Sequence, residues 1–204
     1  MTWAEKAAVP LENELVLLRP VRAEDRAALR AIALDPRIWR YFVARVETEA
    51  EFDAFFDLGI VDQEAGRRVV YYIADKSTGE AAGSMSFCNI MEKDGRLEIG
   101  WSWLGVKWQG KGINRWAKFL MMQHAFEQLG TERVEFKTDQ LNVQARHALT
   151  NIGAREEGTL RSFNPMPDGR RRDAVYYSVL KAEWPQVKEQ LLSGPKVMFA
   201  EVSG

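Results

Sequence analysis

Cysteine is almost absent from this sequence: Cys88 is the only one in 204 residues, so no disulfide can form within the chain. Histidine is nearly as rare, and His124 and His147 have no cysteine or carboxylate partner at metal-ligand spacing, so no metal site is expected. The sequence also lacks an apolar run of the roughly 18 residues that span a bilayer, and Met1–Pro10 lacks the core of a signal peptide. We therefore expect a cytoplasmic protein without a membrane partner.

Charge of one sign is not in excess either. The 28 Lys and Arg nearly balance the 29 Asp and Glu, and the net charge of −1 gives no electrostatic reason to expect a nucleic-acid partner. Apolar residues make up 46% of the chain, which is enough for one substantial core. We expect a single domain over residues 1–204, with its core at about 15–184 and a C-terminal helix and tail at 185–204, as a monomer or a homodimer.

Hydrophobic periodicity divides the chain into strands and helices. Strands are predicted at Leu15–Leu18, Val69–Ala74, Ala81–Ile90, Leu97–Trp103, Arg133–Asp139, Ala154–Arg161 and Ala174–Leu180. Helices are predicted at Ala23–Leu34, Thr48–Gln63, Ile113–Leu129, Val143–Asn151 and Glu183–Leu192. Thr48 and Glu51 have the spacing of a capping box. This order predicts a mixed, largely antiparallel sheet with helices on both faces.

The stretch Gly95–Asn114 joins a strand, a glycine-rich turn and the start of an apolar helix. Leu97, Ile99, Trp101 and Trp103 alternate with polar or small residues, which is typical of a half-buried strand. The turn Gln109–Gly112 follows, and the helix begins directly after it. Glycines allow backbone N–H groups to approach a ligand closely, and a helix N-terminus adds partial positive charge. The stretch therefore predicts a site for an anion such as pyrophosphate.

Three kinds of phosphate loop can be compared with this turn. A nucleotide-triphosphate loop requires Ser or Thr after its Lys, but Gly112 follows Lys111. A dinucleotide fingerprint requires a third glycine where Arg115 stands. The acyl-coenzyme A loop, Gln/Arg-x-x-Gly-x-Gly or its contracted form, fits Gln109–Gly112. A helix-capping turn that binds nothing is the alternative for this loop taken alone.

Further motifs follow in order along the chain: WQGKGIN, AFEQLG, RVEFKTDQLN, IGA, EEGTLR and DAVYYSVL. Together, over Leu15 to Trp184, they resemble the GNAT superfamily of acetyl-CoA-dependent N-acetyltransferases, most closely its RimJ/RimL-type branch, which acetylates ribosomal-protein N-termini. The resemblance implies an α+β (mixed α/β) fold with a largely antiparallel mixed sheet of six to seven strands and a splayed central strand pair. It also implies acetyl-CoA as co-substrate.

The resemblance assigns the co-substrate contacts residue by residue. Backbone groups of Leu104 and Val106 would pair with the pantetheine amides like an added strand. The pyrophosphate would be held by N–H groups of Gln109, Gly110, Lys111, Gly112, Ile113 and Asn114. Asn142 would contact the co-substrate near its thioester, although it could instead cap the helix that follows. Lys111, Arg115 and Arg146 are candidates for the ribose phosphate, or else solvated helix charges.

Two catalytic tasks need residues: removing a proton from the amine and protonating the departing thiolate. Glu98 is the predicted base, on the strand face opposite the tryptophans, unless it is an ordinary exposed glutamate. The branch usually has Ser three residues after the asparagine as the acid, but this chain has Ala145, and Ser162 and Tyr177 are the substitutes. A thiol with a pKa of about 8.5 can also leave as thiolate without an acid.

The acceptor is predicted from the sparse acid–base chemistry. Freeing an α-amine with a pKa of about 7.7–8.0 at pH 7 costs about 1–1.4 kcal/mol, and freeing a lysine amine about 4.6 kcal/mol. We therefore expect the α-amine of a peptide or protein N-terminus. A small-molecule amine and a non-catalytic acyl-CoA-binding module are the alternatives.

Two other segments have open interpretations. Arg170–Arg172 is a solvated run, or it receives an acidic substrate tail. Trp39, Tyr41 and Phe42 pack in the core, or they overhang the acceptor site.

Overall fold

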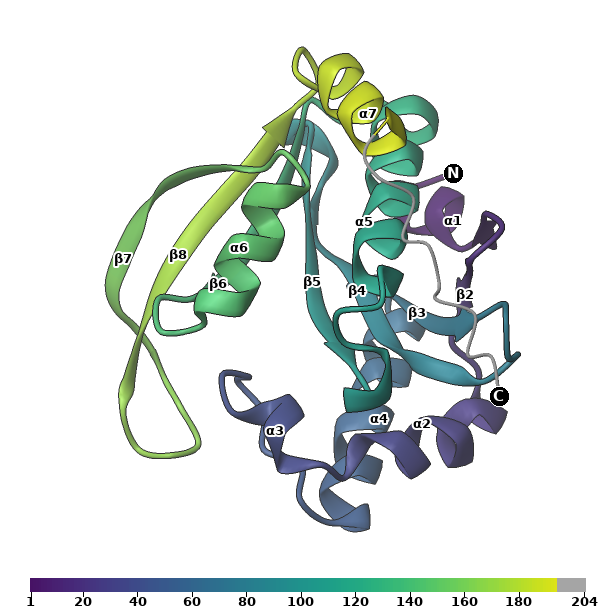
Figure 1. The fold of residues 1–204 in the computed structure, drawn as a ribbon, viewed down its shortest axis with the longest axis vertical. Coiled ribbons are helices and arrows are strands. Elements are labelled where there is room, and N and C mark those ends of the chain that lie inside the picture. Colours follow the sequence, from purple (N-terminus) through teal and green to yellow (C-terminus); the bar gives the residue numbers. More distant parts are fainter. Residues whose placement is uncertain (194–204) are drawn as a thin grey trace, which may run out of the picture.

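The strands of residues 1–193, which the computed structural model describes, form one eight-stranded sheet in the order β1-β2-β3-β4-β5-β6-β8-β7 (Figure 1). The strands are β1 Leu11–Glu12, β2 Val16–Pro20, β3 Val69–Asp75, β4 Ala81–Met91, β5 Arg96–Leu104, β6 Arg133–Asp139, β7 Arg155–Pro165 and β8 Arg171–Leu180. The helices are α1 Trp3–Ala7, α2 Arg26–Ala33, α3 Pro36–Trp39, α4 Glu49–Glu64, α5 Ile113–His124, α6 Val143–Asn151 and α7 Trp184–Ser193.

The two central strands, β5 and β6, are the only parallel neighbours in this sheet. They pair over three positions, Arg96–Glu98 against Arg133–Glu135. Beyond them, β5 continues along β4 alone and β6 along β8 alone, so the two strands diverge. The splayed central pair that the resemblance implied is confirmed.

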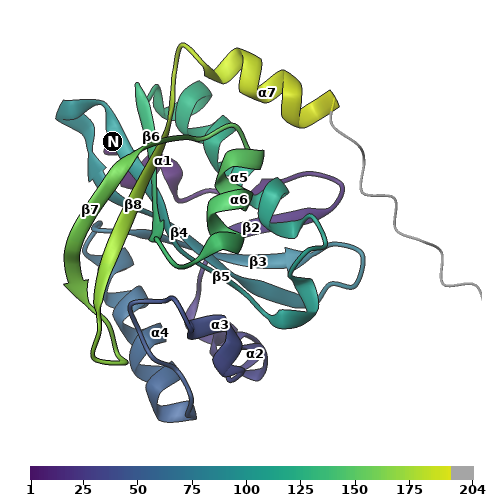
Figure 2. The same ribbon diagram turned by 60° about the vertical axis from the view of Figure 1, so that its left-hand side comes forward.

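Helices cover both faces of the sheet, as predicted, and each face has its own core (Figure 2). The first core packs α5, α6 and α7 against residues such as Leu97, Ile99 and Val134. The second packs α2, α3 and α4 against Val70, Tyr72 and their neighbours on the same strand face. The alternation of side chains along β3 divides its residues between the two cores.

Most predicted elements appear within a few residues of their expected bounds. The Thr48–Glu51 capping box is confirmed, since Glu51 N donates to Thr48 Oγ1 (3.2 Å) and Thr48 N donates to Glu51 Oε2 (3.0 Å). The sheet has eight strands rather than six or seven, because the two-residue strand β1 joins its edge. Helices α1 and α3 were not predicted, since they are too short to show a helical period. The predicted tail from residue 194 onward lies outside the described residues.

Candidate active site

A cavity of about 490 Å³ opens where β5 and β6 diverge; we call it the central cavity. From the face that α5 and α6 cover, it is lined by Asn114, Lys118, Asn142, Ala145, Ala148 and Leu149. From the opposite face, the lining combines charged groups with aromatic rings: Glu98, Lys137, Arg172, Tyr41, Phe42, Trp101 and Phe163. The cavity therefore reaches both faces of the sheet through the gap between the two strands.

The turn that leads into α5 presents unpaired backbone donors. Six consecutive N–H groups, from Gly110 to Arg115, donate to no other residue of the described chain. Gly110 and Gly112 have φ of 76° and 82°, a conformation that disfavours side chains with a Cβ. Gln109 Nε2 donates to the carbonyl of Leu104 (3.1 Å) and holds the turn against the end of β5. Free N–H groups at a helix N-terminus suit a phosphate or pyrophosphate group.

The edge of β5 that faces β6 is unpaired beyond Glu98, so an extended ligand can add to it like a strand. Leu104 ends this strand, as the predicted pantetheine contact requires. Val106 differs, because it begins a short 3₁₀ turn, and its carbonyl accepts the N–H of Gln109. Val106 therefore lies outside the extended edge.

A β-bulge interrupts β5 at Trp101. Ser84–Ser86 of β4 spans the same length as Gly100–Trp103 of β5, so β5 carries one extra residue there. Trp101 adopts a φ of 52°, which is uncommon for a residue other than glycine. Its ring lies 4.3 Å from the guanidinium carbon of Arg68. The bulge therefore changes the direction in which the side chains of β5 point where this strand borders the central cavity.

The bulge also overturns one prediction about Glu98. Strict alternation placed Glu98 on the face opposite Trp101 and Trp103, and this is wrong. The extra residue moves Trp103 to the face that α2 and α4 cover, where it packs in the second core. Glu98 pairs with Cys88 on this same face, while Ile99 packs in the first core.

Glu98 is a buried carboxylate, 6% exposed, that is held by two neighbours. Asn89 Nδ2 donates to Glu98 Oε2 at 2.7 Å, and Lys137 Nζ lies 3.4 Å from the same oxygen. The other oxygen, Oε1, lies over Gly100, where an added Cβ would come within 2.8 Å of it. Because Gly100 has no side chain, the Glu98 carboxylate has room beside it in the central cavity.

We expect Gly100→Ala to displace this carboxylate. The new Cβ would lie 2.8 Å from Glu98 Oε1 and 3.0 Å from Cys88 Sγ, both too close. A displacement of about 1 Å can cost a catalytic group about 10²-fold, so we expect kcat for amine acetylation to fall by about 10- to 100-fold. Coenzyme A affinity, measured by calorimetry, should stay within about twofold. The double variant Gly100→Ala/Cys88→Ala relieves only the sulfur contact, and full recovery in it would contradict a role for the Glu98 contact.

Asn142 caps α6, because its Oδ1 accepts the N–H of Ala145 at 3.0 Å. It also lines the central cavity. The helix-cap interpretation is thus confirmed, and the contact with the co-substrate stays a prediction. Ala145, at the position where the branch has Ser, lines the cavity as well and contributes only a methyl group.

Lys118 is a cavity residue that the sequence did not single out. It lies within the apolar run of α5 and is 6% exposed, and its Nζ donates to Asn114 Oδ1. Burial lowers the pKa of Lys118 to about 8. The sequence feature that could have identified Lys118 as a cavity residue is its position within an otherwise apolar helix face.

We expect Lys118→Met to raise the free energy of unfolding at pH 7 by up to about 3 kcal/mol, since each unit of pKa depression corresponds to about 1.4 kcal/mol. The unfolded chain binds the proton more tightly, so the cost of the charged lysine is full below pH 8. It is relieved as pH rises from 8 to about 10.5. Urea unfolding at pH 7 and pH 10 measures the effect. The exposed Lys93→Met variant is the control, and a less stable Lys118→Met protein at pH 7 would contradict the prediction.

The two predicted acids lie away from Glu98, the predicted base. Ser162 is exposed on β7, and its Oγ accepts a hydrogen bond from Arg171 Nε at 2.9 Å. The Tyr177 hydroxyl donates to Glu156 Oε2 (2.7 Å) and accepts from Arg146 Nε (3.3 Å). Neither residue lines the central cavity. This geometry gives no support to an acid role for either.

The candidates for the ribose phosphate have different surroundings. Lys111 is exposed beside the turn. Arg115 Nη2 donates to the carbonyl of Leu191 (2.7 Å), and Arg146 lies 3.2 Å from a carboxylate oxygen of Glu156. Of the three, Lys111 is the one without a protein partner among residues 1–193.

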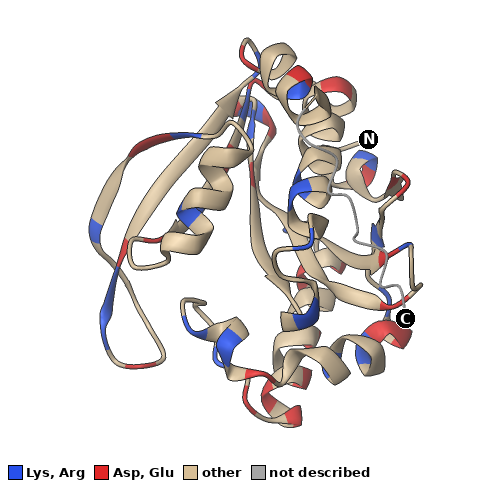
Figure 3. Ribbon diagram, in the orientation of Figure 1, with Lys and Arg blue, Asp and Glu red and all other residues tan. Residues whose placement is uncertain are grey.

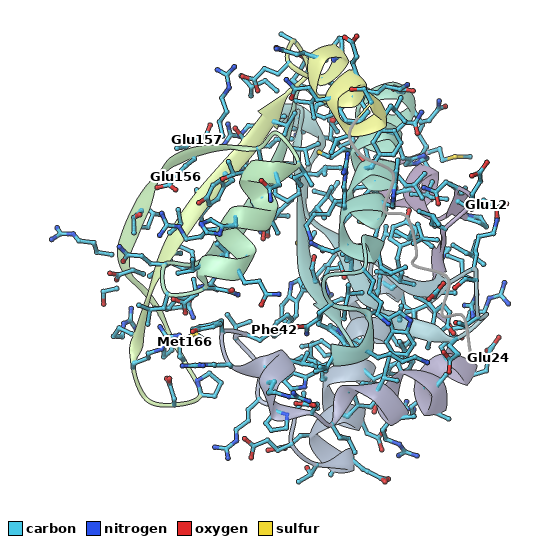
Figure 4. All side chains as sticks on the ribbon, in the orientation of Figure 1. Glu12, Glu24, Phe42, Glu156, Glu157 and Met166 are labelled. Atoms are coloured by element: carbon cyan, nitrogen blue, oxygen red, sulfur yellow. The ribbon has the colours of Figure 1, made fainter. Side chains whose placement is uncertain are left out.

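The aromatic residues after α2 divide between the second core and the central cavity. Trp39 is buried in the second core. Phe42 packs edge-on against Trp39 and Trp101, with centroid distances of 5.0 and 5.9 Å, and it also lines the central cavity. Figure 4 shows Phe42 at the end of α3, beside the gap between α3 and β5. Tyr41 lines the cavity too.

The remaining side chains that could take part in chemistry, Cys88 and His124, are buried within the fold. Cys88 is buried, and burial raises the pKa of its thiol. His124 is buried as well, with Nε2 3.2 Å from the carbonyl of Lys6. Across residues 1–193, no three His, Cys, Asp or Glu side chains come together in a way that could hold a metal ion. No helix in that range is long and apolar enough to cross a membrane.

Comparison with known proteins agrees with this geometry. Residues 16–155 match the family described as acetyltransferase (GNAT) domain. The uncharacterized N-acetyltransferase p20 of Bacillus licheniformis is 29% identical, over 85% of this chain and 97% of its own. The spermidine N(1)-acetyltransferase of Escherichia coli K12 is also 29% identical, over 83% of this chain and 88% of its own.

Among solved structures, Mycobacterium smegmatis RimJ in complex with CoA-disulfide superposes with a TM-score of 0.75. It is 25% identical, with 90% of this chain and 92% of that chain covered. The likeness confirms the RimJ-type branch that the motifs indicated. The chain therefore belongs to the GNAT family of acetyltransferases and is an N-acetyltransferase that uses acetyl-CoA.

Proposed function

We propose that this protein acetylates the α-amine of a peptide or protein N-terminus by direct attack of the amine on acetyl-CoA. One observation carries the proposal: a buried carboxylate, Glu98, lines a cavity that residues of α5 and α6, the helices behind the glycine-rich turn, also line. The cavity crosses the sheet where β5 and β6 diverge. An acyl donor bound from the α5–α6 face and an amine entering from the opposite face would meet in this gap.

The residues on the α5–α6 face are assigned to the acyl donor. The unpaired N–H groups from Gly110 to Asn114 would bind pyrophosphate, whereas the predicted contact of the Gln109 N–H is not available, because that group donates to the carbonyl of Val106. The edge of β5 that ends at Leu104 would pair with the pantetheine amides, although the Leu104 carbonyl already accepts from Gln109 Nε2. Asn142 would contact the co-substrate near its thioester while it caps α6. Acetyl-CoA supplies an activated acetyl group and a thiolate that can leave near neutral pH.

Glu98 is assigned to the amine. Its free oxygen, Oε1, can accept a proton from the amine, while Asn89 and Lys137 hold Oε2 in position. Tyr41 and Phe42 would cover the acceptor. An α-amine suits this site because at pH 7 about a tenth of it is already neutral, whereas a lysine amine is almost wholly charged.

The charges of the cavity also argue against a polyamine. Among the described residues that line it, Glu98 is the only carboxylate, whereas Lys118, Lys137 and Arg172 are cationic. An acceptor with several positive charges would be repelled by this lining. The charge of this cavity therefore argues against spermidine as the acceptor, despite the similarity to a spermidine acetyltransferase.

A panel of acceptors tests the proposal. Thiol release from acetyl-CoA would be measured with N-terminally free peptides, the same peptides with a blocked α-amine and a free lysine, spermidine, and small amines. We expect turnover only with free α-amines. Turnover of spermidine or of a small amine, with none of the peptides acetylated, would replace the proposed acceptor.

A further inference from the structure

Arg172 is a buried guanidinium without a partner. The residue is 5% exposed, and its side chain donates no hydrogen bond and forms no ion pair with any residue in the described range 1–193. Its Nε is fully buried and unsatisfied, and the side chain lines the central cavity. An unpaired charge inside a protein is costly, so such a group is expected to meet its counter-ion in another state of the protein.

The two neighbouring arginines are satisfied by the protein itself. Arg170 pairs with the buried Asp139 and with Asp168 at 3.1 Å. Arg171 donates from Nε to Ser162 Oγ at 2.9 Å and is exposed. Only Arg172, the last arginine of the run, thus has a side chain that points to a ligand.

Strand geometry places Arg172 on the same face as the base. Along β8, Val175, Tyr177 and Val179 pack in the core that α5 and α6 cover, so Arg172 and Tyr176 lie on the opposite face. Lys137 pairs with Tyr176 across β6 and β8, and its Nζ reaches Glu98. Arg172 therefore lines the part of the central cavity that the proposed function gives to the acceptor.

The charge balance in this part of the cavity is positive. The carboxylates of Glu98 and Asp139 both act on the charge of Arg172, but each is shared with another cation, and Glu98 has Lys137 as its neighbour. The carboxylate of Asp139 is bound by Arg170. Figure 3 shows further Lys and Arg along α3 and along the β7–β8 hairpin, where Asp and Glu are interspersed with them. An anionic group on the acceptor would be attracted to this region and would neutralise it.

We infer that Arg172 binds a carboxylate of the acceptor, so the preferred substrate is a peptide with an acidic side chain close to its free α-amine. The inference rests on the proposed function and specifies its substrate class. A guanidinium binds a carboxylate through two parallel hydrogen bonds, which fixes orientation as well as charge. With the carboxylate on Arg172, the amine of the same molecule is left to reach Glu98.

Matched peptides test the inference. Tetrapeptides that carry Glu or Gln at the first, second or third position would be compared by kcat/KM for acetylation, with free glutamate as a separate arm for the α-carboxylate. We expect at least one Glu peptide to exceed its Gln partner by about 10- to 100-fold, the range of a hydrogen-bonded charge pair. In Arg172→Met this preference should fall to within about threefold.

Control variants separate this role from a structural one. Arg161→Met removes the same charge from an exposed position on β7 and should keep the preference. Arg172→Met should keep coenzyme A affinity and unfold at the same or a higher temperature, because an unpaired buried charge is removed. A clear fall in its melting temperature would show that Arg172 stabilises the fold, and it would overturn the inference. Arg172→Lys should recover part of the preference.

Each outcome has a distinct meaning. Equal turnover of Glu and Gln peptides overturns the inference and leaves the proposed function standing. Preference for free glutamate with no peptide acetylated keeps the carboxylate site and removes the peptide acceptor. An acyl-CoA whose acyl group ends in a carboxylate would also be tested as the donor. If Arg172→Met lowers turnover only with that donor, Arg172 binds the donor rather than the acceptor, and the inference is wrong. If no acceptor turns over, calorimetry of the Glu and Gln peptides with the coenzyme A-loaded protein makes the same comparison, and equal binding overturns it.

Discussion

Glu98→Gln is expected to lower kcat for peptide acetylation at pH 7 by about 10²–10⁴-fold. The amide keeps the shape of the side chain, but it cannot take the proton that the amine must lose. Coenzyme A affinity should change by less than about twofold, since Glu98 lies on the strand face away from α5 and the glycine-rich turn. The change in kcat would be measured by thiol release from acetyl-CoA at saturating acetyl-CoA.

The pH dependence of this loss identifies the role of Glu98. As pH rises toward the amine's own pKa of about 8, neutral amine becomes abundant, so the deficit of the variant should shrink. A deficit that is constant with pH would show that Glu98 positions the acceptor instead. Full activity at pH 7 would contradict both roles.

Glu135→Gln is the matched control for this variant. Glu135 pairs with Glu98 across β5 and β6, but its carboxylate is bound by Arg96 and Arg133 and does not line the central cavity. The same change one strand away should leave kcat within about threefold. An equal loss in both variants would indicate damage to the strand pair rather than loss of a base.

Gly112→Val is expected to weaken coenzyme A binding tenfold or more, about 1.4 kcal/mol, with the fold retained. Gly112 is the N-cap of α5 at a φ of 82°, a conformation in which a β-branched residue is strained. Relief of that strain would turn N–H groups of the turn away from the pyrophosphate, and the new side chain would hinder its approach. Calorimetry with coenzyme A measures the change, and circular dichroism checks the fold.

Gly130 provides the control for backbone strain. It ends the helical segment that follows α5 at a φ of 76°, with no atom within 4 Å of an added Cβ. Gly130→Val should therefore lose a similar amount of stability without losing coenzyme A affinity. If Gly112→Val binds coenzyme A as well as the wild type does, the turn is not the pyrophosphate site.

Local sequence determined the elements and the glycine-rich turn. Periods of two and of 3.6 residues mark the strands and longer helices, and the capping box at Thr48 and Glu51 marks the start of α4, because these features depend on neighbours within a few residues. Positive φ at Gly110 and Gly112 follows from the same local rule. Short elements such as α1 and α3 escaped prediction, since a few residues do not define a period.

Only the tertiary structure decided which side chains meet in the central cavity. The bulge at Trp101 depends on pairing with β4, so alternation alone placed Glu98 and Trp103 on opposite faces when they share one. Three adjacent arginines look alike in the sequence, yet Arg172 alone is buried without a partner, because neighbours brought by β7 and β6 satisfy the other two. Burial and pairing are sums over contacts between distant parts of the chain, and no local pattern contains them.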